Sequence, residues 1–521
     1  MKKIIAISVV LALTLSGLAG CGGSSETSGS AGKQLIVATA WEWEGTDAYQ
    51  VNTMQPEQTI MAESLLSMNS KTKEIQPNIA SSFEISEDGR TITLTIPEGL
   101  AYADGTPLTP SDVKRSIEWG LETSPYSSDY SSIKEISVEG DKVILSLENY
   151  SASVMYYLVC DFMPVMSQDQ IDNTSAQDLL MGASPFGLFN VDEYVAASHI
   201  ILKKNAGYQT SNPEAVNRMA SSIDEVMFKI MPDGFSRVTA VKSGEIDIAL
   251  DIPTQNYEEL KNDPNIQLIT SEVPGLHFMI LNKENPLFSD IKIRTAIAYA
   301  LDREKIIEAN KGFMNPVYSF VVPSMMDFDQ SIADYYQDTY CGKLDQSKQL
   351  LKEAGWDDTD GDGYLDKNGK TFEFTLMADA TNVFTKNVSQ IMQANLKEIG
   401  IKLNIEMLEL GYLRDKETQD EYDAALEGFE WAEPMSILPY IIRDSDNIEH
   451  QEFFDMLVKA GEIVDNNARE KAVAEAQKVL MDEVALIPLY NETRLTAVRK
   501  NVTGFYFRTD GNPIFNDVDK N

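Results

Sequence analysis

A strand–helix–strand pattern between residues 372 and 407 constrains the fold of this chain more than any other feature. Phe372–Met377 is strand-like, and Phe384–Lys397 has helical apolar spacing that ends near Gly400. Ile401–Met407 then alternates apolar and polar residues, which is typical of a second strand. Two strands joined by a helical crossover lie parallel in one sheet. We therefore expect a mixed α/β protein built in several lobes.

An earlier stretch, from about residue 76 to residue 181, predicts a small α+β unit. Two hairpins are expected to turn at Asp88–Gly89 and Gly140–Asp141, because alternating apolar runs flank both dipeptides. Between them a helix is predicted to begin at Thr109, which can cap it, with Asp112 completing a capping box.

The remaining elements are predicted from apolar spacing and from Gly and Pro breaks. They are strands at Leu35–Thr39 and Ile246–Leu250 and helices at Glu57–Leu66, Phe235–Lys242, Glu452–Val464 and Ala468–Val484. The chain is predicted to close with short strands, and it shows no internal repeat.

The N-terminus has the pattern of an export signal. Lys2 and Lys3 precede the apolar run Ile4–Leu15, which is too short to span a bilayer, and Leu18–Cys21 reads LAGC. That segment resembles the bacterial lipobox, which implies that residues 1–20 are removed and that Cys21 carries a lipid. The alternative is an ordinary signal peptide with an incidental Cys. Residues 21–33 predict a flexible tether, so we expect the protein at the outer face of the cell membrane, or on the periplasmic side where two membranes are present.

The charge of the chain excludes one class of partner. Its 521 residues include 43 Lys and Arg against 81 Asp and Glu, a formal net charge of -38. Phosphate backbones and anionic lipid surfaces would repel such a polyanion, so nucleic-acid binding is excluded. Two cysteines lie beyond the tether, Cys160 and Cys341, and the sequence leaves open whether they pair or stay buried thiols.

Catalytic signatures are missing from the sequence. Beyond the tether it contains no GxSxG, HExxH, GxxxxGK[ST] or GxGxxG motif. Its three histidines, His199, His277 and His450, are scattered, and a structural role is favoured for each. We therefore expect a protein that is not an enzyme and needs no cofactor. An extracellular hydrolase with paired carboxylates is a weaker alternative, because no pair stands out among the acids.

An Asp-rich loop is the sharpest local motif. In Asp358–Asp366, read DTDGDGYLD, the residues Asp358, Asp360 and Asp362 occupy the first three ligand positions of an EF-hand calcium loop. The acidic residue expected at the twelfth position is replaced by Gly369. We favour an Asp/Gly-rich turn and keep the three aspartates as a weak calcium candidate.

Tryptophans stand beside carboxylates at two places. Trp41, Glu42 and Trp43 follow the first predicted strand, where the two rings would share one face of an extended chain. Glu430 and Trp431 form a similar pair late in the sequence. An acid beside an aromatic ring suits an amine-bearing ligand, although the pattern slightly favours rings that fill a core with solvated acids beside them.

Four further segments, taken together with the lipobox, carry a family resemblance. Tyr102–Val113 (YADGTPLTPSDV) resembles the DGTPLTADDV signature of the bacterial family 5 solute-binding proteins, the oligopeptide- and dipeptide-binding family. Ile293–Ile306 (IRTAIAYALDREKI) is similar to that family's vRqAinyAiDrekI helix, and Val241–Ala249 (VKSGEIDIA) to its l.sGeiDia segment. Asn205–Tyr208 stands where the family has Asn-Pro-x-Tyr-Trp, without the Pro and the Trp.

The resemblance implies a periplasmic-binding-protein-like fold of type II, with two large lobes that hinge shut on a ligand and a smaller inserted domain. It places a discontinuous domain I at residues 34–75, 182–276 and 488–521, domain II at 76–181 and domain III at 277–487. The protein would act as a monomer that delivers peptides to an ABC transporter permease with its ATPase subunits. An oligosaccharide, a nickel chelate or another small solute is the alternative cargo, and a sensory or adhesive lipoprotein is a further one.

The resemblance also implies which residues bind the ligand. Phe429–Pro434 resembles the segment ADYNEP, in which peptide-binding members hold the ligand's free amine with a carboxylate. It puts Glu430 at the acidic position with Trp431 beside it. Thr39–Asp47 resembles the segment that lines the groove, which adds Trp41, Glu42 and Trp43.

Overall fold

The computed structural model describes residues 32–521 apart from 54, 443–450 and 509–510. The predicted signal peptide, the lipid site at Cys21 and nearly all of the tether lie outside the described residues. From Lys33 onward the chain forms one compact unit. No helix in the described ranges has both the length and the apolar character that crossing a bilayer requires.

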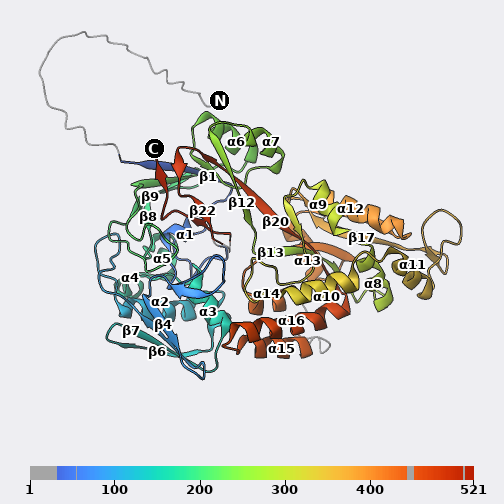
Figure 1. Cartoon of the computed structure of the whole chain (residues 1–521), viewed down its shortest axis with the longest axis horizontal. Coiled ribbons are helices and arrows are strands. Elements are labelled where there is room, and N and C mark those ends of the chain that lie inside the picture. Colours follow the sequence, from blue (N-terminus) through green and yellow to red (C-terminus); the bar gives the residue numbers. More distant parts are fainter. Residues whose placement is uncertain (1–31, 54, 443–450, 509–510) are drawn as a thin grey trace, which may run out of the picture. The chain divides into compact units, whose positions relative to one another are not determined.

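A mixed sheet of 12 strands runs through this unit (Figure 1). Its order is β18-β17-β19-β13-β20-β11-β1-β10-β9-β8, with β12 and β14 also paired to β20. The strands are β1 (Gln34–Thr39), β8 (Phe189–Val195), β9 (His199–Lys204), β10 (Glu225–Ile230), β11 (Ile248–Ala249), β12 (Ile266–Glu272), β13 (Gly275–Leu281), β14 (Met314–Pro316), β17 (Glu373–Asp379), β18 (Lys402–Leu408), β19 (Ala424–Glu430) and β20 (Leu486–Arg499). β1 is parallel to β10 and β11, and β17 is parallel to β18 and β19, whereas the other pairs are antiparallel. The mixed α/β class is thereby confirmed.

The predicted strand–helix–strand unit is present. β17 pairs with β18 from Glu373 with Lys402 to Asp379 with Leu408, and α12 (Thr385–Glu398) is the crossover between them. Val388, Met392 and Leu396 of α12 are fully buried, as the helical spacing of these residues requires.

β20 is longer than the short strands expected at this end of the chain. It extends over 14 residues; its first half pairs with β13 and β14, and its second half with β12 and β11. Its partner strands lie far away in the sequence, so no local pattern predicts the length of β20. The short strands that were predicted follow it, as β21 (Val502–Thr503), β22 (Tyr506–Phe507), β23 (Pro513–Ile514) and β24 (Asp519–Lys520).

Both predicted hairpins of the smaller unit are confirmed in a separate sheet of four strands. Its order is β4 (Ser82–Ile85), β5 (Thr91–Thr95), β7 (Lys142–Leu147) and β6 (Ile133–Glu139). α2 (Pro110–Thr123) starts with the expected capping box: Asp112 N–H donates to Thr109 Oγ1, and Thr109 N–H donates to the Asp112 carboxylate at 2.7 Å. Val113 and Ile117 of α2 are buried in the same core as this sheet.

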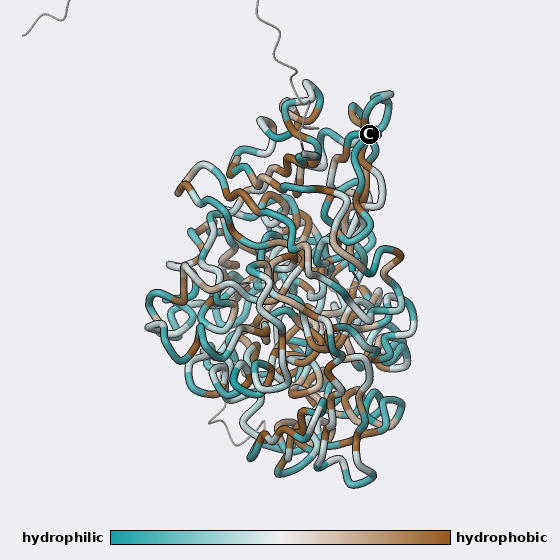
Figure 2. The backbone as a smooth tube through the Cα atoms, turned by 90° about the vertical axis from the view of Figure 1, so that its left-hand side faces the viewer, coloured by the Kyte–Doolittle hydropathy of each residue, from teal (hydrophilic) through white to brown (hydrophobic). Residues whose placement is uncertain are grey.

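The other α-helices of the described chain connect the strands (Figure 1). They are α1 (Gln58–Met61), α3 (Ala152–Val159), α4 (Gln168–Asn173), α5 (Ala176–Gly182), α6 (Gly234–Ser243), α7 (Tyr257–Lys261), α8 (Ile291–Ala300), α9 (Arg303–Ala309), α10 (Gln330–Tyr340), α11 (Leu344–Glu353), α13 (Leu410–Thr418), α14 (Pro434–Ile442), α15 (Gln451–Gly461) and α16 (Asn466–Glu483). Four small strand pairs complete the described fold: β2 (Leu66–Met68) with β3 (Ile75–Pro77), β15 (Asp366–Lys367) with β16 (Lys370–Thr371), β21 with β24, and β22 with β23. Hydrophobic stretches alternate with hydrophilic ones along the described backbone (Figure 2), and the buried ones form two large apolar cores.

Two element predictions need correction. The helix expected at Glu57–Leu66 ends at Met61, because Leu66 begins β2 and pairs with Pro77 of β3. The segment Ile293–Ile306 belongs to two helices rather than one, since α8 ends at Ala300 and the Asp302 carboxylate caps the N-terminus of α9. The helices predicted from Phe235, Glu452 and Ala468 are confirmed as α6, α15 and α16.

Candidate functional site

Two adjoining cavities gather the residues that the sequence singled out. The first, of about 570 Å³, is lined by Tyr126, Tyr156, Phe162, Trp431 and Tyr440, and is called the aromatic cavity below. The second, of about 580 Å³, is lined by Trp41, Glu42, Trp43, Glu44 and Asp251, and is called the tryptophan cavity. Their walls share five residues: Thr53, Glu430, Arg494, Gly511 and Asn512. The structure thus brings all five predicted binding residues to one connected site.

The segment that carries Trp41 and Trp43 is not a strand, so the prediction that both rings share one face is wrong. β1 ends at Thr39, and the chain then turns along the tryptophan cavity. Trp41 is 52% exposed, whereas Trp43 is 4% exposed and packs edge-on against Tyr194 with ring centroids 4.8 Å apart. Trp41 is therefore the ring available to a ligand, and Trp43 supports the wall.

Close backbone packing holds this segment in place. Thr46 N–H donates to Leu180 O at 2.7 Å, and a Cβ on Gly45 would lie 2.4 Å from that same oxygen. The buried Asp47 carboxylate accepts from Trp119 Nε1 on α2 at 2.9 Å. Burial raises the pKa of Asp47 against these opposing hydrogen bonds. The first segment of the site is thus anchored to the smaller unit.

Glu42 and Glu44 line the tryptophan cavity, and both carboxylates accept hydrogen bonds from neighbouring segments of the protein. The Glu42 carboxylate accepts from Tyr194 Oη at 2.7 Å and from Ala197 N at 3.1 Å. The Glu44 carboxylate accepts from Thr53 Oγ1 at 2.5 Å and from Asn52 N at 3.3 Å. Both acids fix loops at the rim of the cavity.

Glu430 is the last residue of β19 and lies where the two cavities meet. Both of its oxygens accept from Arg494 Nη2, at 2.7 and 2.6 Å. Arg494 comes from the middle of β20, and its Nε lies 3.6 Å from Oδ1 of Asp251, just beyond β11. Burial lowers the pKa of Arg494, but the charges of Glu430 and Asp251 outweigh burial and raise it. Neither Arg494 nor Asp251 was predicted, because nothing local in the sequence pairs them with Glu430.

Trp431 projects into a group of aromatic rings from the smaller unit. Its ring centroid lies 5.4 to 5.7 Å from those of Phe162, Tyr156 and Tyr126. The indole Nε1 is buried without a hydrogen-bond partner among the described residues. This contact joins the end of β19 to α3 and its neighbours and forms one wall of the aromatic cavity.

Glu433 keeps the chain after Trp431 in position. Its buried carboxylate accepts from Met435 N at 2.8 Å and from Ser436 N at 2.9 Å, and so caps α14. Burial raises the pKa of Glu433 to about 7, although these hydrogen bonds act in the opposite direction. Its role is therefore structural.

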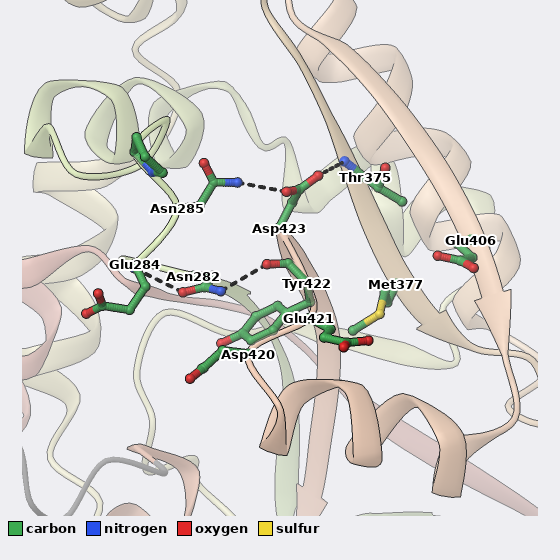
Figure 3. A pocket seen from close by; sticks show the side chains of 11 residues that line it. Asn282, Glu284, Asn285, Thr375, Met377, Glu406, Asp420, Glu421, Tyr422 and Asp423 are labelled. Atoms are coloured by element: carbon green, nitrogen blue, oxygen red, sulfur yellow. Dashed lines mark hydrogen bonds between the residues drawn. The ribbon is translucent and has the colours of Figure 1, made fainter.

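A third cavity, of about 550 Å³, lies elsewhere, between the loop after β13, the strands β17 and β18 and the loop before β19 (Figure 3). Of the described residues lining it, five are acidic and none is basic. Asp423 accepts from Asn285 Nδ2 at 2.7 Å and from Thr375 N at 2.9 Å, which ties the loop to the sheet (Figure 3). None of the predicted binding residues lines this cavity, and Asp423 in its wall has a structural role.

The Asp-rich loop forms a turn between α11 and β15. Oxygens of Asp358, Asp360 and Asp366 approach within 4.8 Å of one another, whereas Asp362 is not in this group and instead accepts from Tyr364 N at 2.8 Å. The Asp358 carboxylate also accepts from Gly361 N and Gly363 N, at 2.7 and 3.1 Å. These bonds support the turn that the sequence favoured, and calcium binding stays a prediction.

The described histidines and cysteines lie apart from the two cavities, except Cys160. His277 on β13 pairs with Glu492 at 2.9 Å and stacks on Tyr490, and His450 lies outside the described residues. Cys160 and Cys341 are both thiols, and Cys160 lines the aromatic cavity. Cys160 and Cys341 are therefore not joined by a disulfide.

A family model describes most of the chain. Residues 74–446 match the model of the bacterial extracellular solute-binding proteins, family 5 middle. The match includes Glu430 and Trp431, and it ends before Arg494.

Curated relatives match along nearly the whole chain. The oligopeptide-binding protein AppA of Bacillus subtilis is 25% identical over 537 residues, covering 96% of this chain and 95% of AppA. The glutathione-binding protein GsiB of Shigella boydii is 23% identical, covering 94% and 95%.

Solved structures share the fold. AppA of Bacillus subtilis in complex with a nonapeptide has a TM-score of 0.72 at 22% identity, covering 94% of this chain and 99% of that structure. NikA of Brucella suis in complex with Fe(III)-EDTA has a TM-score of 0.80 at 18% identity, covering 94% and 100%. The periplasmic-binding-protein type II fold is thereby confirmed.

Proposed function

Because this chain belongs to family 5 of the bacterial extracellular solute-binding proteins, we propose that it captures peptides and delivers them to an ABC transporter. One observation carries the proposal: a pair of opposite charges, Glu430 and Arg494, lies between two cavities with aromatic walls. Charged groups at the centre suit the termini and backbone of a peptide, and the roomy aromatic walls tolerate many side chains.

The relatives support a peptide over other solutes. The two curated relatives bind an oligopeptide and glutathione, which is itself a peptide. The NikA structure contains a metal chelate, but a likeness of 18% identity shows the fold alone. Of the described residues, no histidine lines either cavity, so a directly coordinated metal has little support.

In this proposal the cavities lie between the lobes that close on the ligand. Domain I comprises residues 34–75, 182–276 and 488–521, domain II residues 76–181, and domain III residues 277–487. Glu430 and Trp431 then belong to domain III, whereas Trp41, Glu42 and Trp43 belong to domain I. The loaded monomer docks on the permease, whose ATPase partner subunits drive import.

Native mass spectrometry of freshly purified protein tests the peptide proposal. We expect the released ligands to be a mixture of short peptides, because enclosed ligands survive purification when their dissociation is slow. A single sugar or a metal chelate in place of peptides would overturn the proposal.

We also propose that Cys21 anchors the protein to the outer face of the membrane. A denaturing mass spectrum of detergent-extracted protein is expected to show the loss of residues 1–20 and an added lipid mass. The variant Cys21→Ser should lack the lipid and leave the membrane fraction. An unmodified Cys21 in the wild-type protein would contradict the anchor.

A further inference from the structure

Besides the rings around Trp431, a second contact joins the smaller unit to the helices α15 and α16 (Figure 1). Asn149, in the segment after β7, donates from Nδ2 to Glu462 Oε1 at 2.9 Å, in the loop between the two helices. A Cβ on Gly89 would lie 2.9 Å from Cγ2 of Val464, so the β4–β5 turn lies directly against that loop. This contact is called the clasp below, and it consists of Gly89, Asn149, Tyr150, Glu462, Val464 and Arg469.

Tyr150 is the buried centre of the clasp. It is 5% exposed, and its hydroxyl is hydrogen-bonded to the side chain of Arg469 on α16. Arg469 is itself buried and donates from Nε to both carboxylate oxygens of Asp327, at 2.9 and 3.0 Å. It also donates to Ile463 O at 3.0 Å and to Asn466 Oδ1 at 2.9 Å. Residues on its own side of the contact therefore hold the guanidinium in place.

The clasp lies at the boundary between the two large apolar cores. Tyr150 belongs to one core, whereas Phe453 of α15 belongs to the other. The core of Tyr150 also contains Leu35 and Phe228 of domain I, so the smaller unit is packed onto domain I. In the proposed division into domains, α15 and α16 belong to domain III, on the opposite side of the closure. A separation of the lobes would therefore break the bonds of the clasp.

The clasp adjoins the ligand site without being part of it. Of the described residues that line either cavity, none belongs to the clasp. The two are connected through Asp327, because the N–H of the preceding Met326 donates to Ala432 O at 2.9 Å, and Ala432 lines the aromatic cavity. The clasp thus forms beside the aromatic cavity and makes no contact with what fills it.

We propose that the clasp is a latch that stabilises the closed lobes and thereby strengthens the binding of every peptide by the same factor. This inference rests on the proposed function, which supplies the closure. Open ligand-free protein lacks the bonds of the clasp and closed liganded protein gains them, so they add to the free energy of binding. Because the clasp does not touch the ligand, its contribution is independent of the peptide sequence.

The variant Tyr150→Phe measures the latch, since it removes the hydroxyl and keeps the ring. The probes are synthetic copies of the two most abundant peptides released from the purified protein, each titrated calorimetrically into ligand-free protein. We expect both dissociation constants to rise by a common factor of about five, the usual effect of losing one hydrogen bond. The rise should come from faster dissociation, measured by displacing one peptide with an excess of the other, because the latch acts after the peptide is enclosed.

A double-mutant cycle tests the exposed part of the clasp. Asn149→Ala and Glu462→Ala each remove one end of the same hydrogen bond, so each should raise both dissociation constants by about twofold. The double variant should rise no further than either single variant, because the second substitution removes a bond that is already lost.

Tyr335→Phe is the matched control. It deletes a hydroxyl that donates to a charged group, Asp482, at 2.5 Å, but both residues belong to domain III. Its effect is therefore confined to one side of the closure, and both dissociation constants should keep their wild-type values. Urea unfolding of each ligand-free variant verifies that it folds.

The outcomes separate the latch from the proposed function. If Tyr150→Phe changes the free energy of unfolding but neither dissociation constant, the clasp is a permanent contact and the latch is refuted. A rise that differs more than about threefold between the two peptides refutes it as well, since the residue would then act on the ligand. Either result leaves peptide capture intact. Purified protein that releases no peptide and binds no member of a random pentapeptide library overturns the proposed function, and the latch with it.

Discussion

Glu57, beside the tryptophan cavity, is a deeply buried acid. It is 1% exposed, and neither of its oxygens has a hydrogen-bond partner among the described residues. Burial raises the pKa of Glu57 to about 7, and the nearby charge of Glu42 acts in the same direction. The folded protein therefore holds a proton here that the unfolded chain releases at lower pH.

This proton makes stability depend on pH. A raised pKa in the folded state means that the free energy of unfolding falls as pH rises from the unfolded value toward 7. Between pH 5 and pH 8 the ionisation of Glu57 alone should lower the free energy of unfolding by roughly 2.5 kcal/mol. Each unit of difference between the folded and unfolded pKa corresponds to about 1.36 kcal/mol.

The variant Glu57→Gln keeps the shape of the protonated acid and cannot ionise. We expect its advantage over the wild-type protein in free energy of unfolding to grow by roughly 2.5 kcal/mol between pH 5 and pH 8. Urea unfolding at both pH values measures the difference. A variant that gains nothing at pH 8 would show that Glu57 is solvated in solution.

Residues of the site differ in how far local sequence could identify them. Glu430, Trp431 and Trp41 stand in recognisable acid–aromatic pairs, and the structure places them at one site. Arg494 was not predicted, because its role depends on an ion pair with Glu430, 64 positions away in the sequence. Asp251 follows a predicted strand directly, a position where ligands often bind in open α/β sheets.

At the scale of elements, the capping box of α2 offers a test of local stability. Replacing Thr109 by Ala removes the acceptor for Asp112 N–H and the hydroxyl that bonds the Asp112 carboxylate at 2.8 Å. The free energy of unfolding should fall by about 1 kcal/mol, the usual effect of losing an N-cap. Thr109→Ser keeps the hydroxyl and should lose less than half as much in urea unfolding. Equal losses in the two variants would contradict the role of the cap.

Elements were predictable where short-range patterns determine them. The capping box, the hairpin turns at Asp88–Gly89 and Gly140–Asp141 and the crossover helix α12 are encoded within a few residues, and all are present. The length of β20 was not predictable, because pairing with distant strands determines it. The helix α1 ends earlier than expected because Leu66 already belongs to β2, which pairs with the nearby β3. The error at Trp41 and Trp43 has another cause: the alternation of ring and acid continues past the end of β1, so it does not mark where the strand ends.

At the scale of the whole molecule, the aromatic cavity draws its wall from both large apolar cores. Tyr156 and Phe162 belong to one core, whereas Phe429 and Ile437 pack against the other. A ligand that contacts both walls should therefore stabilise both parts of the protein together. At a ligand concentration about a hundredfold above the dissociation constant, the free energy of unfolding should rise by about 2.7 kcal/mol.

Scanning calorimetry with and without a captured peptide measures this coupling. We expect the whole unfolding transition to move to higher temperature, with any separate components moving together. A shift confined to one component would mean that the ligand contacts only one of the two cores.

The placement of the tryptophans gives the protein a built-in optical signal. Of its five tryptophans, Trp41 and Trp43 line one cavity and Trp431 lines the other. Trp41 is exposed to water until a ligand covers it, so its emission should move to shorter wavelength on binding, while Trp119 and Trp356 contribute a constant background. Ligand capture can thus be followed in the unlabelled protein by fluorescence alone.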